Sequence, residues 1–94
     1  GLLIPHPNGI VIHPGAEIGV NCLVNQQVTI GVNHKSECSA RIGAHVDIGA
    51  GAKIIGNICI GHDVLIGDNA VVVNDVDARC VVAGIPAKVI SRTK

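Results

Sequence analysis

The stretch that decides the fold is IGAGAKIIGNICIGHDVLIGDNAVVV, residues 48–73. A large aliphatic residue returns in it at every sixth position, at Ile48, Ile54, Ile60, Ile66 and Val72. A period of six is neither that of an α-helix nor that of a simple strand, so it marks an internal repeat. Only a chain that coils on itself can bury one set of side chains at this period. The stretch therefore predicts a solenoid of short strands.

The same period extends through most of the chain, with large aliphatic residues at Ile12, Ile18, Val24, Ile30 and Ile42. A second apolar set lies two positions earlier in the hexads, at Ile10, Ala16, Cys22, Val28, Val46, Ala52, Ile58, Val64, Ala70 and Val76. Residues two apart in a strand point to the same side, so both sets are predicted to face inward. Residue types that tolerate positive φ predict tight turns at Gly15, Asn21, His45, Gly51, Asn57, Asp63 and Asn69. We therefore expect one all-β domain over residues 1–94, a parallel β-helix of about three to four coils.

One interval breaks the period, because Ile30 and Ile42 are 12 residues apart. This interval can hold either a degenerate hexad or a six-residue insertion. In a straight continuation His34 and Ser36 would point inward, and burying two unpaired polar groups would cost several kcal/mol. We therefore expect residues 32–41, VNHKSECSAR, to form an extruded loop.

The two ends of the predicted coil differ. After Val76 the period dissolves into DARCVVAGIPAKVI, residues 77–90, which we expect to form a short C-terminal cap, with a short helical segment as the one place for a helix. No such cap precedes the first coil, which would expose strand edges and an apolar bore. The chain starts at Gly1 without an initiator methionine and is expected to be a fragment, so a missing segment or a partner should cover that end.

The composition excludes several classes of function. Hydrophobic residues make up 48% of the chain, yet Phe, Tyr, Trp and Met are absent, which predicts a narrow aliphatic interior. Seven basic residues balance seven acidic ones and no aromatic ring can stack on a base, so nucleic-acid binding is not expected. The four cysteines show no C-x-x-C spacing that would indicate zinc or a redox centre. With no membrane span and no signal peptide, we expect a cytoplasmic protein.

Four segments carry a resemblance to a known family: HPNGIVI at 6–12, QQVTIG at 26–31, IGAGAKIIGN at 48–57 and AGIPAKVI at 83–90. Together they resemble the C-terminal half of bacterial serine O-acetyltransferases. The resemblance implies a left-handed β-helix of hexapeptide repeats and an assembly that is a homotrimer or a dimer of trimers. It also implies transfer of the acetyl group from acetyl-CoA to the hydroxyl of L-serine, for cysteine synthesis.

The same resemblance assigns the candidate site. The catalytic base of the family falls on His6, whose type suits the task because a serine hydroxyl must lose its proton as it attacks the thioester. Acetyl-CoA, a co-substrate rather than a bound cofactor, is implied to lie in a groove between subunits along Gly31, Val32 and Ala50, with Lys88 near its phosphates. No metal is implied.

Three departures from the family leave alternatives open. An N-terminal helical domain and the carboxylate that orients the histidine lie upstream of Gly1 in the family, and its loop carries an Arg-His pair where this chain has Cys38-Ser39. A sugar of polysaccharide synthesis is the alternative acceptor, and a non-catalytic trimerisation module is the second alternative. A zinc enzyme resembling the gamma-class carbonic anhydrases is disfavoured because the two ligand histidines five residues apart are absent. His13, His45 and His62 are expected in turns and His34 in the loop.

Overall fold

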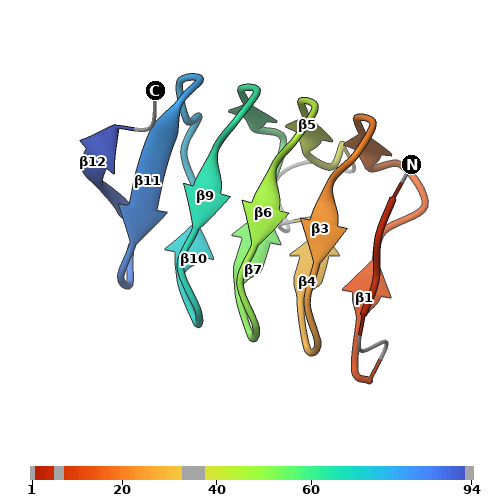
Figure 1. Ribbon diagram of the computed structural model, residues 1–94. Helices are drawn as coiled ribbons and strands as arrows, with labels where there is room; N and C mark the ends of the chain where they lie inside the picture. The colour runs from red at the N-terminus through yellow and green to blue at the C-terminus, as the bar shows by residue number, and fades with distance from the viewer. Residues whose placement is uncertain (1, 6–7, 33–37, 93–94) are drawn as a thin grey trace.

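The computed structural model describes residues 2–5, 8–32 and 38–92, and the chain winds into a three-sided prism (Figure 1). Each coil adds a strand to three sheets, which we call faces A, B and C. Face A holds β3 (Leu23–Val24), β6 (Asp47–Ile48), β9 (Leu65–Ile66), β11 (Cys80–Ala83) and β12 (Lys88–Arg92). Face B holds β1 (Val11–Ile12), β4 (Thr29–Gly31), β7 (Lys53–Ile55) and β10 (Val71–Val72), and face C holds β2 (Glu17–Ile18), β5 (Arg41–Ile42) and β8 (Cys59–Ile60). The predicted left-handed parallel β-helix is confirmed, and the described residues contain no helix.

The register of the strands locates the insertion. On face B, Ile12 pairs with Ile30 and Ile54 with Val72, each 18 residues away. Ile30 instead pairs with Ile54, 24 residues away (54 − 30), so this coil holds six residues more than a regular coil of 18. The surplus lies between β4 and β5, which confirms a six-residue insertion rather than a degenerate hexad. Residues 33–37 of the predicted loop, including His34 and Ser36, lie outside the described residues.

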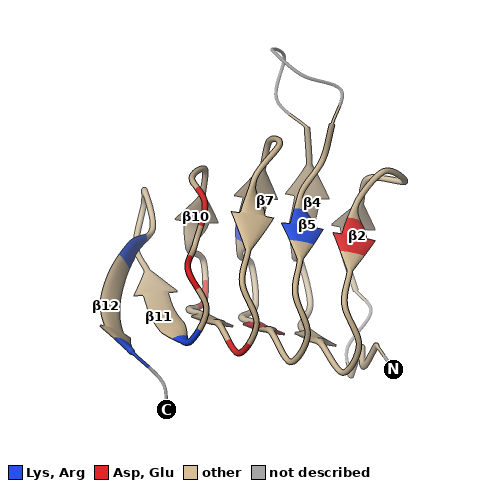
Figure 2. Ribbon diagram, turned by 90° about the horizontal axis from the view of Figure 1, so that it is seen from above, with Lys and Arg blue, Asp and Glu red and all other residues tan. Residues whose placement is uncertain are grey.

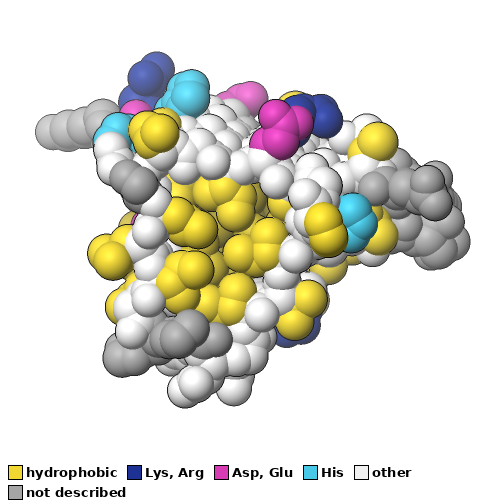
Figure 3. Space-filling model, turned by 90° about the vertical axis from the view of Figure 1, so that its right-hand side faces the viewer, with side chains coloured by type: hydrophobic (Ala, Val, Ile, Leu, Met, Phe, Trp, Pro, Cys, Tyr) yellow, Lys and Arg dark blue, Asp and Glu magenta, His cyan; other side chains and the backbone are white. Residues whose placement is uncertain are grey.

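The interior is built from the two predicted inward sets. Its fully enclosed members include Ile30, Ile48 and Ile54, which are 0% exposed. Ala40 joins them at the position two before Ile42. In the first coil the inward residues Ile10, Ile12, Ala16 and Ile18 are only half-buried, because no described coil lies over them. Figure 3 looks onto this end and shows the hydrophobic side chains gathered in the middle of the prism, which confirms the open apolar bore.

Near the C-terminus the structure corrects the predicted register. Val76 bridges to Ile60, 16 residues earlier, and Val82 pairs with Ile66 at the same separation (82 − 66). One turn is therefore two residues short, and Val76 occupies the large aliphatic position instead of the second apolar one. The side chain of Asp75 allows the short turn, because its Oδ1 accepts the N–H of Cys59 at 2.8 Å in place of a backbone carbonyl.

The C-terminal cap is a β-hairpin. Strand β11 continues face A in parallel with β9 and buries Cys80 and Val82, so the core extends beyond the predicted repeat. Strand β12 then turns back antiparallel along β11. The cap is thus confirmed, but it consists of strands and contains no helical segment.

Most of the predicted turn positions have positive φ, namely Asn21, His45, Gly51, Asp63 and Asn69. Gly15 and Asn57 do not, although Gly15 lies in a turn and Asn57 in a bend, so their predicted positions between strands are confirmed and only the positive φ is missing. In the turn after β7, which ends at Ile55, Gly56 takes the positive φ instead. Gln27 and Arg79 adopt positive φ without belonging to the residue types that predict it.

Glycine after four of the inward isoleucines allows the coils to approach closely, at Gly19, Gly43, Gly49 and Gly61. A Cβ added to Gly61 would lie 2.5 Å from the backbone nitrogen of Ala78, whereas one on Gly31 would meet nothing nearer than Ile55 Cδ1 at 3.7 Å. We expect Gly61→Ala to destabilise the fold by about 1–3 kcal/mol, the usual cost of overpacking. Thermal unfolding followed by circular dichroism measures this, with Gly31→Ala as the matched control. Equal melting temperatures for the two variants would contradict the prediction.

Candidate acetyl-transfer site

The three faces meet at three corners, which organise the candidate site. Corner AB joins faces A and B through residues 25–28, 49–52 and 67–70. Corner BC joins faces B and C, and its described residues are 13–16, 32, 38–40, 56–58 and 73–75. Corner CA joins faces C and A through residues 19–22, 43–46 and 61–64.

His6 lies outside the described residues, whereas Leu3 before it and Asn8 after it are described. Leu3 bridges to Leu23 on face A, and the carbonyl of Asn8 accepts the N–H of Gln27 at 2.8 Å. Leu3 thus lies on face A, and Asn8 lies at corner AB one coil before Gln27.

Ala50 and Lys88 lie along the same corner AB. The N–H of Ala50 donates to Asp68 Oδ1 at 2.9 Å, and the carbonyl of Ala50 accepts the N–H of Asn69 at 2.8 Å. At the next level the N–H of Ala87 donates to the carbonyl of Val71 at 2.8 Å, which places the exposed Lys88 at the start of β12 beside this corner. The structure thus brings these two predicted residues to one edge of the prism.

Gly31 and Val32 lie at corner BC, on the opposite edge of face B from Ala50. Gly31 ends β4, and its carbonyl accepts the N–H of Gly56 at 3.0 Å. Packing within this chain does not require glycine at position 31, because a Cβ there would make only ordinary van der Waals contacts. One copy of the chain therefore does not bring all the predicted acetyl-CoA residues together, and it leaves Gly31 open to a group from outside.

A groove of about 410 Å³ on face C was not predicted from the sequence. It is open, and its lining includes Glu17, Arg41 and Cys59 together with Gly19 and Gly43, which add no side chains. Figure 2 shows its charged strands as the red of β2 and the blue of β5. In the sequence, the groove could have been found from the outward residues that stand directly before the inward Ile18, Ile42 and Ile60.

Arg41 is held at the centre of this groove by its neighbours. Its guanidinium donates to Asn57 Oδ1 and to Cys59 Sγ, each at 3.0 Å. The hydrogen bond to Cys59, together with the charge of that group, raises the pKa of Arg41 above its usual value. The side chain is therefore a fixed positive charge on face C.

Asp47 occupies the corresponding central position on the outside of face A. Its register partners are Leu23 on β3 and Leu65 on β9. Burial raises the pKa of the Asp47 carboxyl group, and the nearby carboxylate of Asp68 raises it further. The outer side of face A is thus mainly aliphatic with one poorly solvated carboxylate in its middle.

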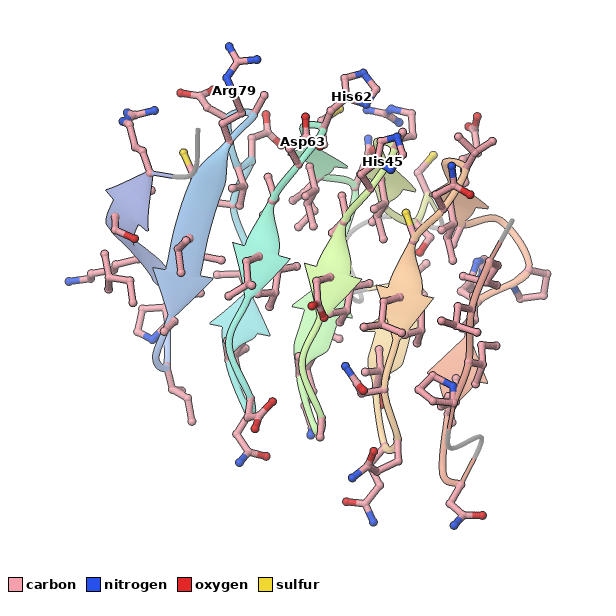
Figure 4. All side chains as sticks on the ribbon, in the orientation of Figure 1. His45, His62, Asp63 and Arg79 are labelled. Atoms are coloured by element: carbon pink, nitrogen blue, oxygen red, sulfur yellow. The ribbon has the colours of Figure 1, made fainter. Side chains whose placement is uncertain are left out.

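The described histidines have structural contacts. His62 Nδ1 accepts the N–H of Ala44 at 2.7 Å, and His13 Nδ1 accepts that of Gly15 at 2.9 Å. Figure 4 shows His45 and His62 near Asp63 and Arg79 at corner CA, where His45 adopts positive φ. Within the described part of the chain, no three His, Cys, Asp or Glu side chains are grouped to hold a metal ion. None of its elements is a helix long and apolar enough to cross a membrane.

Comparison with known proteins identifies relatives of this β-helix. No family model matches the chain. The serine acetyltransferase of Synechococcus elongatus is 43% identical over 95 residues, which cover 99% of this chain and 39% of that protein. The crystal structure of the Brucella abortus serine acetyltransferase in complex with coenzyme A superposes with a TM-score of 0.96 at 37% identity, covering 99% of this chain and 38% of that one. The Neisseria gonorrhoeae enzyme in complex with serine gives 0.89 at 41% identity, with coverage of 94% and 36%.

The chain spans about two fifths of the length of these relatives. The match nevertheless covers the first coil, both sides of the insertion and the C-terminal hairpin, because nearly the whole chain is included. Over its full length, therefore, this chain is a homologue of the C-terminal, hexapeptide-repeat part of the serine acetyltransferases.

Proposed function

We propose that this chain is the β-helical part of an acetyltransferase that moves the acetyl group of acetyl-CoA to the hydroxyl of L-serine, as a step toward cysteine. The observation that carries the proposal is the identity of about 40% over the whole chain to serine acetyltransferases, including structures with serine and with coenzyme A. The cytoplasm is part of the proposal, because none of the four cysteines forms a disulfide in the described structure, as is usual in a reducing compartment.

In this mechanism His6 is the general base. Its imidazole takes the proton of the serine hydroxyl as the oxygen attacks the thioester carbonyl of acetyl-CoA. The tetrahedral intermediate then collapses, the carbon–sulfur bond breaks, and the imidazolium returns the proton to the CoA thiolate. The reaction leaves O-acetylserine and CoA, with the histidine again neutral. Neither step requires a metal ion, since positioning and hydrogen-bond donors to the oxyanion supply the remaining catalysis.

The co-substrate groove is proposed to form between two copies of the chain in a homotrimer. Gly31 and Val32 at corner BC of one copy would face Ala50 and Lys88 at corner AB of the next. Ala50 allows the CoA arm to approach the backbone, as does the open position at Gly31. The ammonium group of Lys88 would lie near the CoA phosphates.

A sugar acceptor is the second candidate, and the segment before β5 favours it. Where the family carries an Arg-His pair, this chain has an exposed Cys38 and a buried Ser39. The hydroxyl of Ser39 has no hydrogen-bond partner in the structure and is enclosed, so it cannot replace two charged or titratable side chains that face a substrate. The acceptor site therefore differs in chemistry from that of the family.

An acceptor assay separates the candidates. The full-length protein that carries this chain is incubated with acetyl-CoA and either L-serine or an amino sugar such as glucosamine, and release of the CoA thiol is followed. We expect L-serine to give the higher kcat/KM, by about tenfold or more, since a site built to hydrogen-bond one acceptor discriminates strongly against another. Thiol release with the sugar and none with L-serine would overturn serine as the acceptor. Release with neither would favour the non-catalytic trimerisation module.

A further inference from the structure

We propose that the groove on face C is a modification site, in which Cys59 forms a mixed disulfide with the disulfide of a small zwitterionic thiol, an amino-acid disulfide such as cystine. Cys59 supplies the attacking sulfur, Arg41 binds a carboxylate of the reagent, and Glu17 binds its ammonium group. None of these three side chains has a part in the proposed acetyl transfer, so the site is independent of that function.

Three different functional groups stand side by side in this groove. Glu17 on β2 pairs in register with Arg41 on β5, and Arg41 pairs with Cys59 on β8. Neighbouring strands of a sheet lie about 4.8 Å apart, so the carboxylate, the guanidinium and the thiol form one column along the axis of the coil. Figure 2 shows the first two as the red of β2 beside the blue of β5. All three residues are exposed, so one reagent in the groove can contact them together.

The groove has room for such a reagent. Gly19 and Gly43 lie two positions after Glu17 and Arg41 and therefore on the same outer side of their strands, where they leave bare backbone beside the column. The close contact of the coils requires these glycines, because a Cβ on either would lie within 3 Å of the next coil. The volume of about 410 Å³ falls within the range of about 300–1,000 Å³ that is usual for small-molecule sites.

Arg41 is held in place and still has hydrogen-bond donors to offer. Its Nη1 donates to Asn57 Oδ1 and its Nη2 to Cys59 Sγ, each at 3.0 Å. A guanidinium carries five N–H donors, so the side chain keeps donors for a carboxylate of the reagent. The attraction between the guanidinium and the charge of Cys59 also contributes to the raised pKa of Arg41. Arg41 can therefore hold a carboxylate directly beside the sulfur that attacks.

Cys59 is the cysteine that combines exposure with contact to a cation. Cys22 and Cys80 are buried, whereas Cys38 and Cys59 are exposed. Of these two, only Cys59 lines the groove. The nearest acidic group is already engaged, because Asp75 Oδ1 accepts the backbone N–H of Cys59 at 2.8 Å. Cys38 therefore serves as an exposed comparison thiol in the same chain.

The reaction is a thiol–disulfide exchange. The thiolate of Cys59 attacks one sulfur of the reagent, a bond forms between Sγ and that sulfur, and the sulfur–sulfur bond of the reagent breaks. The other half leaves as a thiolate and takes up a proton equivalent to the one that Cys59 lost. The sulfur of Cys59 is oxidised and the departing half is reduced, so the reagent itself is the oxidant. Excess thiol reverses the exchange, and the modification therefore follows the ratio of disulfide to thiol around the protein.

Three disulfides that differ in their charged groups test the site. Each half of cystine carries a carboxylate and an ammonium group, each half of dithiodipropionate only the carboxylate, and each half of cystamine only the ammonium group. The reduced full-length protein that carries this chain is mixed with each reagent at neutral pH, and mass spectrometry of its peptides follows Cys59 and Cys38 separately. We expect cystine to modify Cys59 at least about tenfold faster than Cys38.

Variants of the two charged residues separate their roles. Arg41→Gln should slow the reaction of Cys59 with cystine and with dithiodipropionate by about fivefold or more, and the reaction with cystamine much less. Glu17→Gln should slow the reactions with cystine and with cystamine, and leave that with dithiodipropionate within about twofold. Lys53→Gln removes a positive charge from face B and is the matched control, which should leave all three rates within about twofold. Circular dichroism shows that each variant keeps its strands.

Two results would overturn the proposal. One is a Cys59 that reacts with cystine no faster than Cys38 does. The other is an Arg41→Gln variant that slows all three reagents equally, because Arg41 would then act on the sulfur of Cys59 alone and the groove would not recognise the charges of the reagent. Failure of the proposed function is distinguishable, since the peptide masses are measured without acetyl-CoA and without an acceptor.

Discussion

Replacing His6 by alanine is expected to lower kcat by about 10²–10⁴ in the full-length protein, the usual contribution of a general base. The Kd of acetyl-CoA should stay within about twofold of the parent value, because the imidazole acts on the acceptor hydroxyl and not on the CoA arm. The prolines at positions 5 and 7 support this role, since they restrict the backbone on either side of the base and reduce the freedom it must lose.

Two further variants control this experiment. His6→Asn keeps a hydrogen-bonding side chain that cannot accept a proton near neutral pH, so it should be as inactive as His6→Ala. His13→Ala removes a histidine whose Nδ1 only accepts the N–H of Gly15, and it should retain most of the activity. Turnover by His6→Ala within a few-fold of the parent would show that His6 is an ordinary loop residue.

Replacing Ile54 by aspartate is expected to prevent folding. Ile54 is 0% exposed and lies between Ile30 and Val72 in the ladder of face B. A carboxylate there would face an aliphatic interior with no cation in reach, which costs several kcal/mol or more. The whole stability of a small domain is about 5–15 kcal/mol, and a chain of this size is at the low end.

The measurement is thermal unfolding by circular dichroism after expression of the variant. Lys53→Asp introduces the same side chain at the preceding, outward position of β7 and should fold with a cooperative transition. Ile54→Val removes one methyl group and should cost only about 0.5–1.5 kcal/mol. A soluble Ile54→Asp protein that melts cooperatively would show that the inward register is wrong.

Regular repetition explains what could be predicted from the sequence. Each hexad moves the chain on by one face of the prism, so an aliphatic residue that recurs every six residues points inward on each face in turn, and the core residues followed from counting. The same reasoning found the insertion after Ile30, because a polar hexad cannot occupy an aliphatic bore. It failed where the chain departs from the period, at the turn between Val72 and Val76, since a side chain of Asp75 replaces backbone there. It also could not show that the cap is a hairpin.

For the candidate site, too, some assignments came from the sequence and others needed the tertiary structure. His6 was assigned from a local motif and its resemblance, which needs no knowledge of distant contacts, and its own placement lies outside the described residues. The sequence alone determined the repeat, the aliphatic core and the family. Only the tertiary structure decided that Gly31 and Ala50 lie on opposite edges of face B, and that Asp47 and Arg41 face outward from adjacent sheets at one height. The physical reason is that a period states which residues point inward, whereas the neighbours of an outward residue depend on how many residues each coil contains.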